Sequence, residues 1–129
     1  MIIDSSALVA ILLKEPEQTA FIAAITADRT RLCGAPTLVE TGMVIVSRRG
    51  EAGLAELRAF YQRAAIQTAG FGPELVELAV EAFRRFGRGR HPAGLNFGDC
   101  ISYALAKATG EPLLFKGDDF SQTDIRRAA

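Results

Sequence analysis

Four carboxylates, well separated along the chain, stand where they could act together: Asp4, Glu40, Asp99 and Asp118. Asp4 and Asp118 each follow a short apolar run that is typical of a buried strand. Glu40 and Asp99 each lie in the first turns of a predicted helix. Ligands of an open parallel sheet bind outside the carboxyl ends of its strands, so we expect these four acids to converge on one rim.

Four ionised carboxylates cannot cluster unless positive charge compensates them, because each negative charge makes the others harder to ionise. Apart from Lys116 and the group Arg84–Arg90, few basic residues flank the acids. An all-oxygen ligand set suits Mg²⁺ or Mn²⁺. Such an ion lowers the pKa of a bound water and neutralises a phosphodiester. The pattern therefore predicts metal-assisted hydrolysis of a phosphate ester, with one acid as a candidate base.

Short apolar segments alternate with helical patterns along the chain. The predicted strands cover residues 1–3, 31–35, 66–69 and 113–115. The predicted helices cover residues 7–13, 16 onward, 36–49, 51–65, 73–86 and 97–109. Ser5 or Ser6 can cap the first helix, Gly50 can stop the third, and Ile125 can belong to a short edge strand. This alternation favours one α/β domain over residues 1–129, a three-layer α/β/α sandwich around a short parallel sheet.

Composition narrows the possible functions. Apolar residues make up 49% of the chain and charged residues 23%, which is typical of a soluble globular protein. The formal net charge is +0, so the total charge argues neither for nor against a nucleic-acid partner. Cys33 and Cys100 lie in apolar surroundings and are expected to be buried free thiols. With one histidine and no paired cysteines, a Cys/His zinc site is excluded.

No targeting or membrane segment is expected. Asp4 interrupts the apolar start, which argues against a secretory signal. The longest apolar run, residues 7–13, is too short to span a bilayer. The simplest expectation is a cytoplasmic protein.

Each acid also has a purely structural explanation. Asp4 could cap the helix that follows it, and Glu40 could simply be favoured by the positive end of its helix dipole. Asp118 and Asp119 could both belong to a turn, and at most one of them needs to face the site. Asp99 stands three residues after Asn96, which is the spacing of a capping box. This last explanation is compatible with metal binding, because a cap that holds Asp99 also holds a ligand.

Four stretches, taken in order, resemble the PIN-domain ribonucleases, and most of all the VapC toxins of bacterial type II toxin–antitoxin pairs. They are I-I-D-S-S-A-L near the start, P-T-L-V-E at 36–40, L-N-F-G-D-C-I-S-Y-A-L-A at 95–106 and L-L-F-K-G-D-D-F at 113–120. The resemblance covers essentially the whole chain. It implies a Mg²⁺- or Mn²⁺-dependent endoribonuclease that cuts structured RNA such as tRNA or rRNA.

The resemblance also assigns roles to residues. It implies that Asp4 and Asp99 are the main metal ligands, and that Glu40 and Asp118 complete the site directly or through water. Ser6 matches a small hydroxyl residue that family members place beside the first acid.

The last motif departs from the family pattern. Many relatives carry Thr or Ser two residues before the last acid, where this chain has Lys116. A lysine there could contact a phosphate or partly neutralise the acids. Asp119 competes with Asp118 for the fourth position, and we prefer Asp118.

An acid-free run between Ala82 and Gly98 contains Arg84, Arg85, Arg88, Arg90 and His91. The arginines could grip RNA phosphates beside the acidic rim. They could equally be the solvated end of a helix, where arginine is favoured. His91 carries no catalytic assignment.

The early helices carry more apolar side chains than one small core obviously needs: Leu12, Leu13, Phe21 and Ile22. The resemblance implies a homodimer and a VapB-like antitoxin that covers the active-site face. Ordinary core packing would explain the same side chains without any partner.

Other function classes fit less well. A phospho-receiver needs an acid pair near the first strand and an acceptor Asp after a middle strand, but Asp4 stands alone and residues 66–70 end in no acid. A haloacid-dehalogenase phosphatase needs Asp-x-Asp, and Ser6 occupies the second position. A domain of the same fold that only binds RNA stays open.

Overall fold

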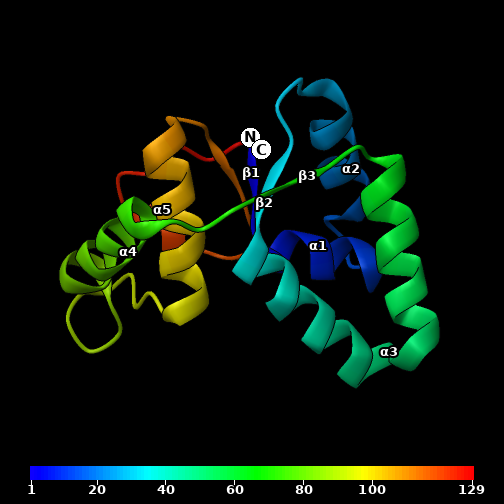
Figure 1. Cartoon of the computed structure of the whole chain (residues 1–129), viewed down its shortest axis with the longest axis horizontal. Helices are drawn as coiled ribbons and strands as arrows, with labels where there is room; N and C mark the ends of the chain where they lie inside the picture. Colours follow the sequence, from blue (N-terminus) through cyan, green and yellow to red (C-terminus); the bar gives the residue numbers. More distant parts are fainter.

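A short parallel sheet lies between two layers of helices in the computed structural model, which describes residues 1–129 (Figure 1). The four strands are β1 (Ile2–Ile3), β2 (Leu32–Gly34), β3 (Gln67–Ala69) and β4 (Leu113–Leu114), in the order β3-β2-β1-β4. All pairs are parallel, and Ile2 of β1 pairs with Leu32 on one side and Leu113 on the other. The predicted parallel sheet is confirmed.

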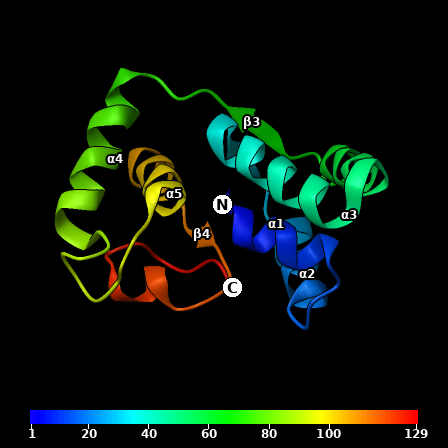
Figure 2. The same ribbon diagram turned by 90° about the horizontal axis from the view of Figure 1, so that it is seen from below.

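The helices are α1 (Ser5–Leu12), α2 (Gln18–Ala27), α3 (Ala35–Arg63), α4 (Pro73–Phe86) and α5 (Phe97–Thr109), with a short 3₁₀ helix, η1, at Asp119–Gln122. Figure 1 shows α1, α2 and α3 on one side of the sheet and α4 and α5 on the other, and Figure 2 shows the same division from below. The predicted three-layer α/β/α arrangement is confirmed.

The central strand β1 joins two separate apolar cores. Successive side chains of a strand point to opposite faces, so Ile3 packs with α1, α2 and α3 while Ile2 packs with α4 and α5. Both isoleucines are fully buried. The residue that follows them, Asp4, is thereby placed at the end of β1 between the two helical layers.

Local signals set most helix ends. The predicted bounds of α4 and α5 are confirmed, and Gly110 ends α5 in the left-handed conformation. The two helices predicted around Gly50 form α3, with a kink at Gly50, whose φ is 62°. The predicted cap of α1 by Ser5 or Ser6 is wrong, because Asp4 is the capping residue.

One expectation about the end of the chain needs correction. The strand predicted around Ile125 is instead a single parallel bridge between Leu113 and Arg127, because the backbone groups of Arg126 and Ala128 are the ones that bond to Leu113. Ile125 packs against the core on the α4 and α5 side of the sheet.

The early helices do not supply surplus apolar surface. Leu12 and Phe21 are buried, and Leu13 and Ile22 pack against the same core, so the ordinary packing explanation holds. The large apolar side chains that are exposed lie on α3, α4 and the start of α5: Val39, Met43, Val46, Val76, Val80, Phe83 and Phe97.

Two smaller points complete the description. Cys33 and Cys100 are buried and free, as predicted. None of the helices combines the length and the apolar character that a membrane crossing would require.

Candidate active site

Asp4 is the most deeply buried of the acids, with 3% of its surface exposed. Its carboxylate accepts three hydrogen bonds: Oδ2 from the backbone N–H of Ser6 (3.0 Å) and the Ser6 hydroxyl (2.6 Å), and Oδ1 from the Ser102 hydroxyl (2.5 Å). The first of these bonds is the helix cap of α1. Asp4 is therefore held in one orientation by neutral donors, without a basic partner.

Asp99 is fixed at the start of α5 by the predicted capping box. Asn96 Oδ1 accepts from the Asp99 backbone N–H at 2.9 Å, and Asp99 Oδ2 accepts from the Asn96 backbone N–H at 2.9 Å. Burial raises the pKa of the Asp99 carboxyl to about 6; the hydrogen bond from Asn96 opposes this, and the charges of Asp4, Asp119 and Glu40 add to it. The charges of acids from three other segments thus act on Asp99.

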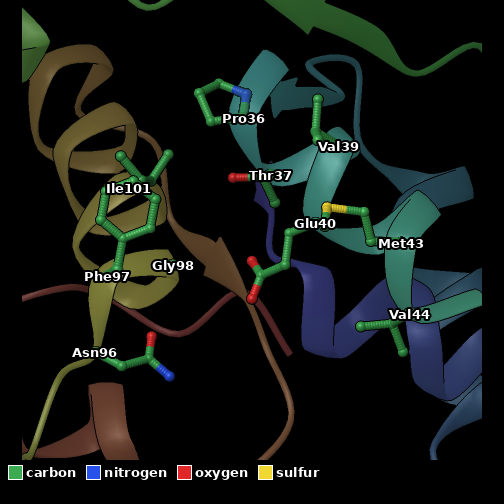
Figure 3. Close-up of a pocket in the computed structure, with 10 residues that line it drawn as sticks. All are labelled: Pro36, Thr37, Val39, Glu40, Met43, Val44, Asn96, Phe97, Gly98 and Ile101. Atoms are coloured by element: carbon green, nitrogen blue, oxygen red, sulfur yellow. The ribbon is translucent and has the colours of Figure 1, made fainter. Parts of the chain in front are cut away.

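Glu40 reaches from α3 toward the start of α5. It lines a cleft of about 770 Å³ together with Asn96 and Gly98, and Figure 3 shows its carboxylate pointing across that cleft. A Cβ atom at Gly98 would lie 2.6 Å from Glu40 Oε1, so only glycine permits this approach. Burial raises the pKa of Glu40, the Ser5 side chain opposes the shift, and the charge of Asp4 adds to it.

Asp118 and Asp119 are both exposed in the segment after β4. Asp119 begins η1, and its charge contributes to the raised pKa of Asp99, whereas Asp118 does not figure among the causes of that shift. Of the two acids, only Asp119 adds its charge to the raised pKa of Asp99. The preference for Asp118 from the sequence stays a prediction.

The Lys116 side chain is paired with acids other than the four candidate site residues. Its ammonium group donates to Glu15 and lies 3.4 Å from the Glu17 carboxylate, so its charge is already paired on the side of α1 and α2. Its backbone N–H donates to the Ser6 hydroxyl at 3.0 Å, which ties the end of β4 to the residue beside Asp4. None of the ion pairs joins Lys116 to Asp4, Glu40, Asp99 or Asp118, and its contact with a phosphate stays a prediction.

The four arginines of the basic run are exposed: Arg84, Arg85, Arg88 and Arg90. Arg84 pairs with Glu81, and Arg85 lies 3.8 Å from Asp124. Arg90 donates to the Arg84 carbonyl at 3.4 Å. Their contact with RNA stays a prediction. His91 accepts a hydrogen bond from the Ala93 backbone N–H at 3.0 Å, which is a loop role.

Sequence reasoning missed Ser102 and Gly98. Ser102 stands three residues after Asp99, on the same side of α5, and that spacing is the one signal the sequence offers. Gly98 lies within the stretch 95–106 that carries the family resemblance, but its closeness to Glu40 depends on how α3 and α5 pack.

The carboxylates of Asp4, Glu40 and Asp99 have the right chemistry for a hard cation, although they are not closely grouped. No three His, Cys, Asp or Glu side chains are grouped closely enough to hold a metal ion by themselves. None of the ion pairs involves Asp4, Glu40 or Asp99, so their charge is uncompensated. Mg²⁺ keeps several waters and needs only one or two carboxylates, which matches this arrangement.

Comparison with known proteins places the chain in a family. The sequence profile of the PIN domain matches residues 1–126. The chain belongs to the PIN-domain family. This PIN domain is 49% identical over 129 residues to ribonuclease VapC30 of Mycobacterium tuberculosis, covering 100% of this chain and 98% of the relative. It is 47% identical over 125 residues to ribonuclease VapC of Mycolicibacterium smegmatis, covering 97% of each. The predicted resemblance to VapC ribonucleases is confirmed.

Solved structures share the PIN-domain fold. The chain superposes on VapC20 of M. tuberculosis, a toxin that cleaves the sarcin–ricin loop, with a TM-score of 0.77, 17% identity and coverage of 96% of this chain and 95% of that one. It also superposes on a chain of VapBC2 from Rickettsia felis, bound to promoter DNA, with a TM-score of 0.74, 14% identity and coverage of 98% and 94%. At these identities the likeness concerns the fold.

We predict that Asp99 titrates with a pKa of about 6 in metal-free protein, well above its ordinary value of 3.8. The folded state then keeps this proton up to about pH 6 while the unfolded state releases it near pH 4, so this residue's contribution to stability falls as the pH rises between those values. Carboxyl ¹³C NMR titration measures the pKa directly.

The Asp4→Asn variant should lower the pKa of Asp99, because it removes a neighbouring negative charge. Glu77→Gln, an exposed position on α4, should leave it unchanged. A pKa near 3.8 in the wild-type protein would contradict the described burial of Asp99.

Proposed function

We propose that this protein is an endoribonuclease that hydrolyses RNA phosphodiester bonds with the help of Mg²⁺, for which Mn²⁺ can substitute. The observation that carries the proposal is the uncompensated charge of Asp4, Glu40 and Asp99, two of them rigidly held by hydrogen bonds. A cation would supply the missing positive charge. The membership in the PIN-domain family and the similarity to VapC ribonucleases support the same conclusion.

The residues divide into two roles. Asp4 and Asp99 would hold the cation, since both are fixed in orientation and partly or fully buried. Glu40 and the acid after β4 would complete the site directly or through water. A bound cation lowers the pKa of water and neutralises charge on the phosphodiester. Glu40, whose raised pKa favours holding a proton, is placed at the cleft to accept one.

We further propose that the protein is the toxin of a type II toxin–antitoxin pair. Its relatives at 41% to 49% identity are named as VapC ribonucleases. A VapB-like antitoxin would then cover the active-site face, and structured RNA such as tRNA or rRNA would be the substrate. The basic run Arg84–Arg90 lies on the chain just before the segment that carries Asp99, where it could contact phosphates. A cytoplasmic location follows from this role.

The homodimer implied by the resemblance has a candidate surface. An apolar groove of about 560 Å³ runs between α4 and the starts of α3 and α5, lined by Pro36, Phe71, Val76, Val80, Phe83 and Phe97, among others. Phe97 is 80% exposed. Contiguous exposed apolar surface of this kind is typical of an interface, and we assign it to a second copy of the chain.

The first test concerns the acids and the metal. RNA cleavage should require Mg²⁺ or Mn²⁺, stop on chelation, and fall by about 100-fold or more in Asp4→Asn and Asp99→Asn. The assay measures the initial rate on labelled RNA, with circular dichroism to confirm folding. Glu77→Gln serves as the matched acid away from the site.

Asp118→Asn and Asp119→Asn, compared in the same assay, identify the fourth acid. The larger loss should occur at Asp119 if its charge acts on Asp99 as described. If the wild-type protein binds RNA but does not cleave it with either metal, the proposed ribonuclease activity is contradicted. The alternative of a domain that only binds RNA would then be favoured.

Gly98→Ala should separate activity from stability. The added methyl group must displace the Glu40 carboxylate, while alanine in the first turn of α5 keeps or improves stability by up to about 1 kcal/mol. We expect the cleavage rate to fall by about 10- to 100-fold with no loss of melting temperature.

Gly70→Ala is the control for this substitution, since nothing lies within 4 Å of a Cβ atom at that position. It should leave the cleavage rate unchanged. Full activity in Gly98→Ala would show that the position of Glu40 is unimportant.

The dimer surface can be tested by charge. Val80→Glu places a carboxylate in the apolar groove and should convert a dimer into a monomer in light scattering after size exclusion, without unfolding it. Ala55→Glu, at an exposed position of α3 after the kink at Gly50, is the control and should leave the dimer intact. A wild-type monomer, or a Val80→Glu dimer, would contradict the assigned interface.

A further inference from the structure

We propose that Ser102 is a positioning residue for Asp4, and that its hydroxyl group sets the orientation in which Asp4 meets the cation. The inference rests on the proposed metal-dependent function and adds a residue to it. Ser102 is fully buried in the middle of α5, with 1% of its surface exposed.

The geometry separates Ser102 from an ordinary helical serine. A buried serine inside a helix usually donates to the carbonyl four residues earlier, as Thr109 does to Leu105 in the same helix. The Ser102 hydroxyl instead donates to Asp4 Oδ1 at 2.5 Å, across 98 residues of sequence. This bond is charge-assisted and therefore stronger than a bond between neutral groups.

The two oxygens of Asp4 accept hydrogen bonds from two different helices. Ser6, at the start of α1, donates its backbone N–H and its hydroxyl to Oδ2, while Ser102 donates to Oδ1 from α5. With Ser6 alone, only Oδ2 would accept hydrogen bonds and Oδ1 would have no donor. The bond from Ser102 fixes the second oxygen as well and leaves the remaining lone pairs of Asp4 for a cation.

Ser102 also links the two proposed metal ligands. It stands three residues after Asp99 on α5, so one helix carries both Asp99 and the group that holds Asp4. The bond therefore fixes the spacing between a ligand at the end of β1 and a ligand in the first turn of α5. Hydrogen bonds that orient metal ligands in this way typically change metal affinity by about 10- to 100-fold.

The test uses purified full-length protein and Mn²⁺ alone as the probe. Mn²⁺ binding is measured by calorimetric titration, independently of turnover, and RNA cleavage is measured in parallel. In Ser102→Ala we expect the Mn²⁺ dissociation constant to rise by about 10-fold or more. The kcat should fall, while KM for RNA stays within about twofold, because Ser102 does not face the substrate.

Two variants guard the interpretation. Ser102→Cys keeps a weak donor of similar shape and should give an intermediate dissociation constant, which also covers the case in which Ser102→Ala does not fold. Thr41→Val removes another buried hydroxyl, one that donates to the Thr37 carbonyl, and should leave Mn²⁺ binding unchanged.

The outcomes are distinct. Suppose that the wild-type protein cleaves RNA, and that folded Ser102→Ala, or Ser102→Cys if Ser102→Ala does not fold, binds Mn²⁺ as tightly as the wild-type protein. This result would overturn the role of Ser102 and leave the proposed function standing. An equal loss in Thr41→Val would show a general packing effect and would also overturn it. A wild-type protein that neither binds Mn²⁺ nor cleaves RNA would overturn the proposed function, and this inference with it.

Discussion

Burial of the Asp4 carboxylate without a basic partner is the constraint on which the rest of the site depends. An ionised carboxylate loses much of its hydration when it is buried, and this cost must be offset by hydrogen bonds or by opposite charge. Here Ser6 and Ser102 supply neutral donors from two helices, on either side of the sheet. These bonds hold the group in place, but they leave its charge uncompensated. Burial raises the pKa of Asp99 and Glu40, and the charge of Asp4 adds to this effect.

The fold concentrates these charges because β1 is central. Ile2 and Ile3 belong to different cores, so the end of β1 lies where the two helical layers meet. From one layer α3 extends Glu40, and from the other α5 supplies Asp99. The absence of a side chain at Gly98 lets the two helices bring Glu40 close to the first turn of α5. A cation at this junction would neutralise the repulsion that the architecture creates, which ties stability and catalysis to the same carboxylates.

Lys116 and Arg85 form ion pairs with acids other than Asp4, Glu40 and Asp99. Lys116 follows β4 but pairs with Glu15 and Glu17, and Arg85 lies against Asp124. Asp4, Glu40 and Asp99 are therefore left without an ion-pair partner, and this arrangement suits a cation as the partner of these acids.

The sequence by itself determined what depends on neighbouring residues. The bounds of α4 and α5, the capping box of Asn96 and Asp99, and the break at Gly50 all follow from signals within a few residues, and the order of the acid motifs indicated the family. Only the tertiary structure decided which distant groups meet. It brought the Ser102 hydroxyl to Asp4, Gly98 close to the Glu40 carboxylate, and Lys116 into an ion pair with Glu15. It also left the exposed apolar side chains on α3 and α4 instead of on the early helices. Such pairings depend on how whole helices pack across the sheet, and short-range sequence patterns carry no record of that packing.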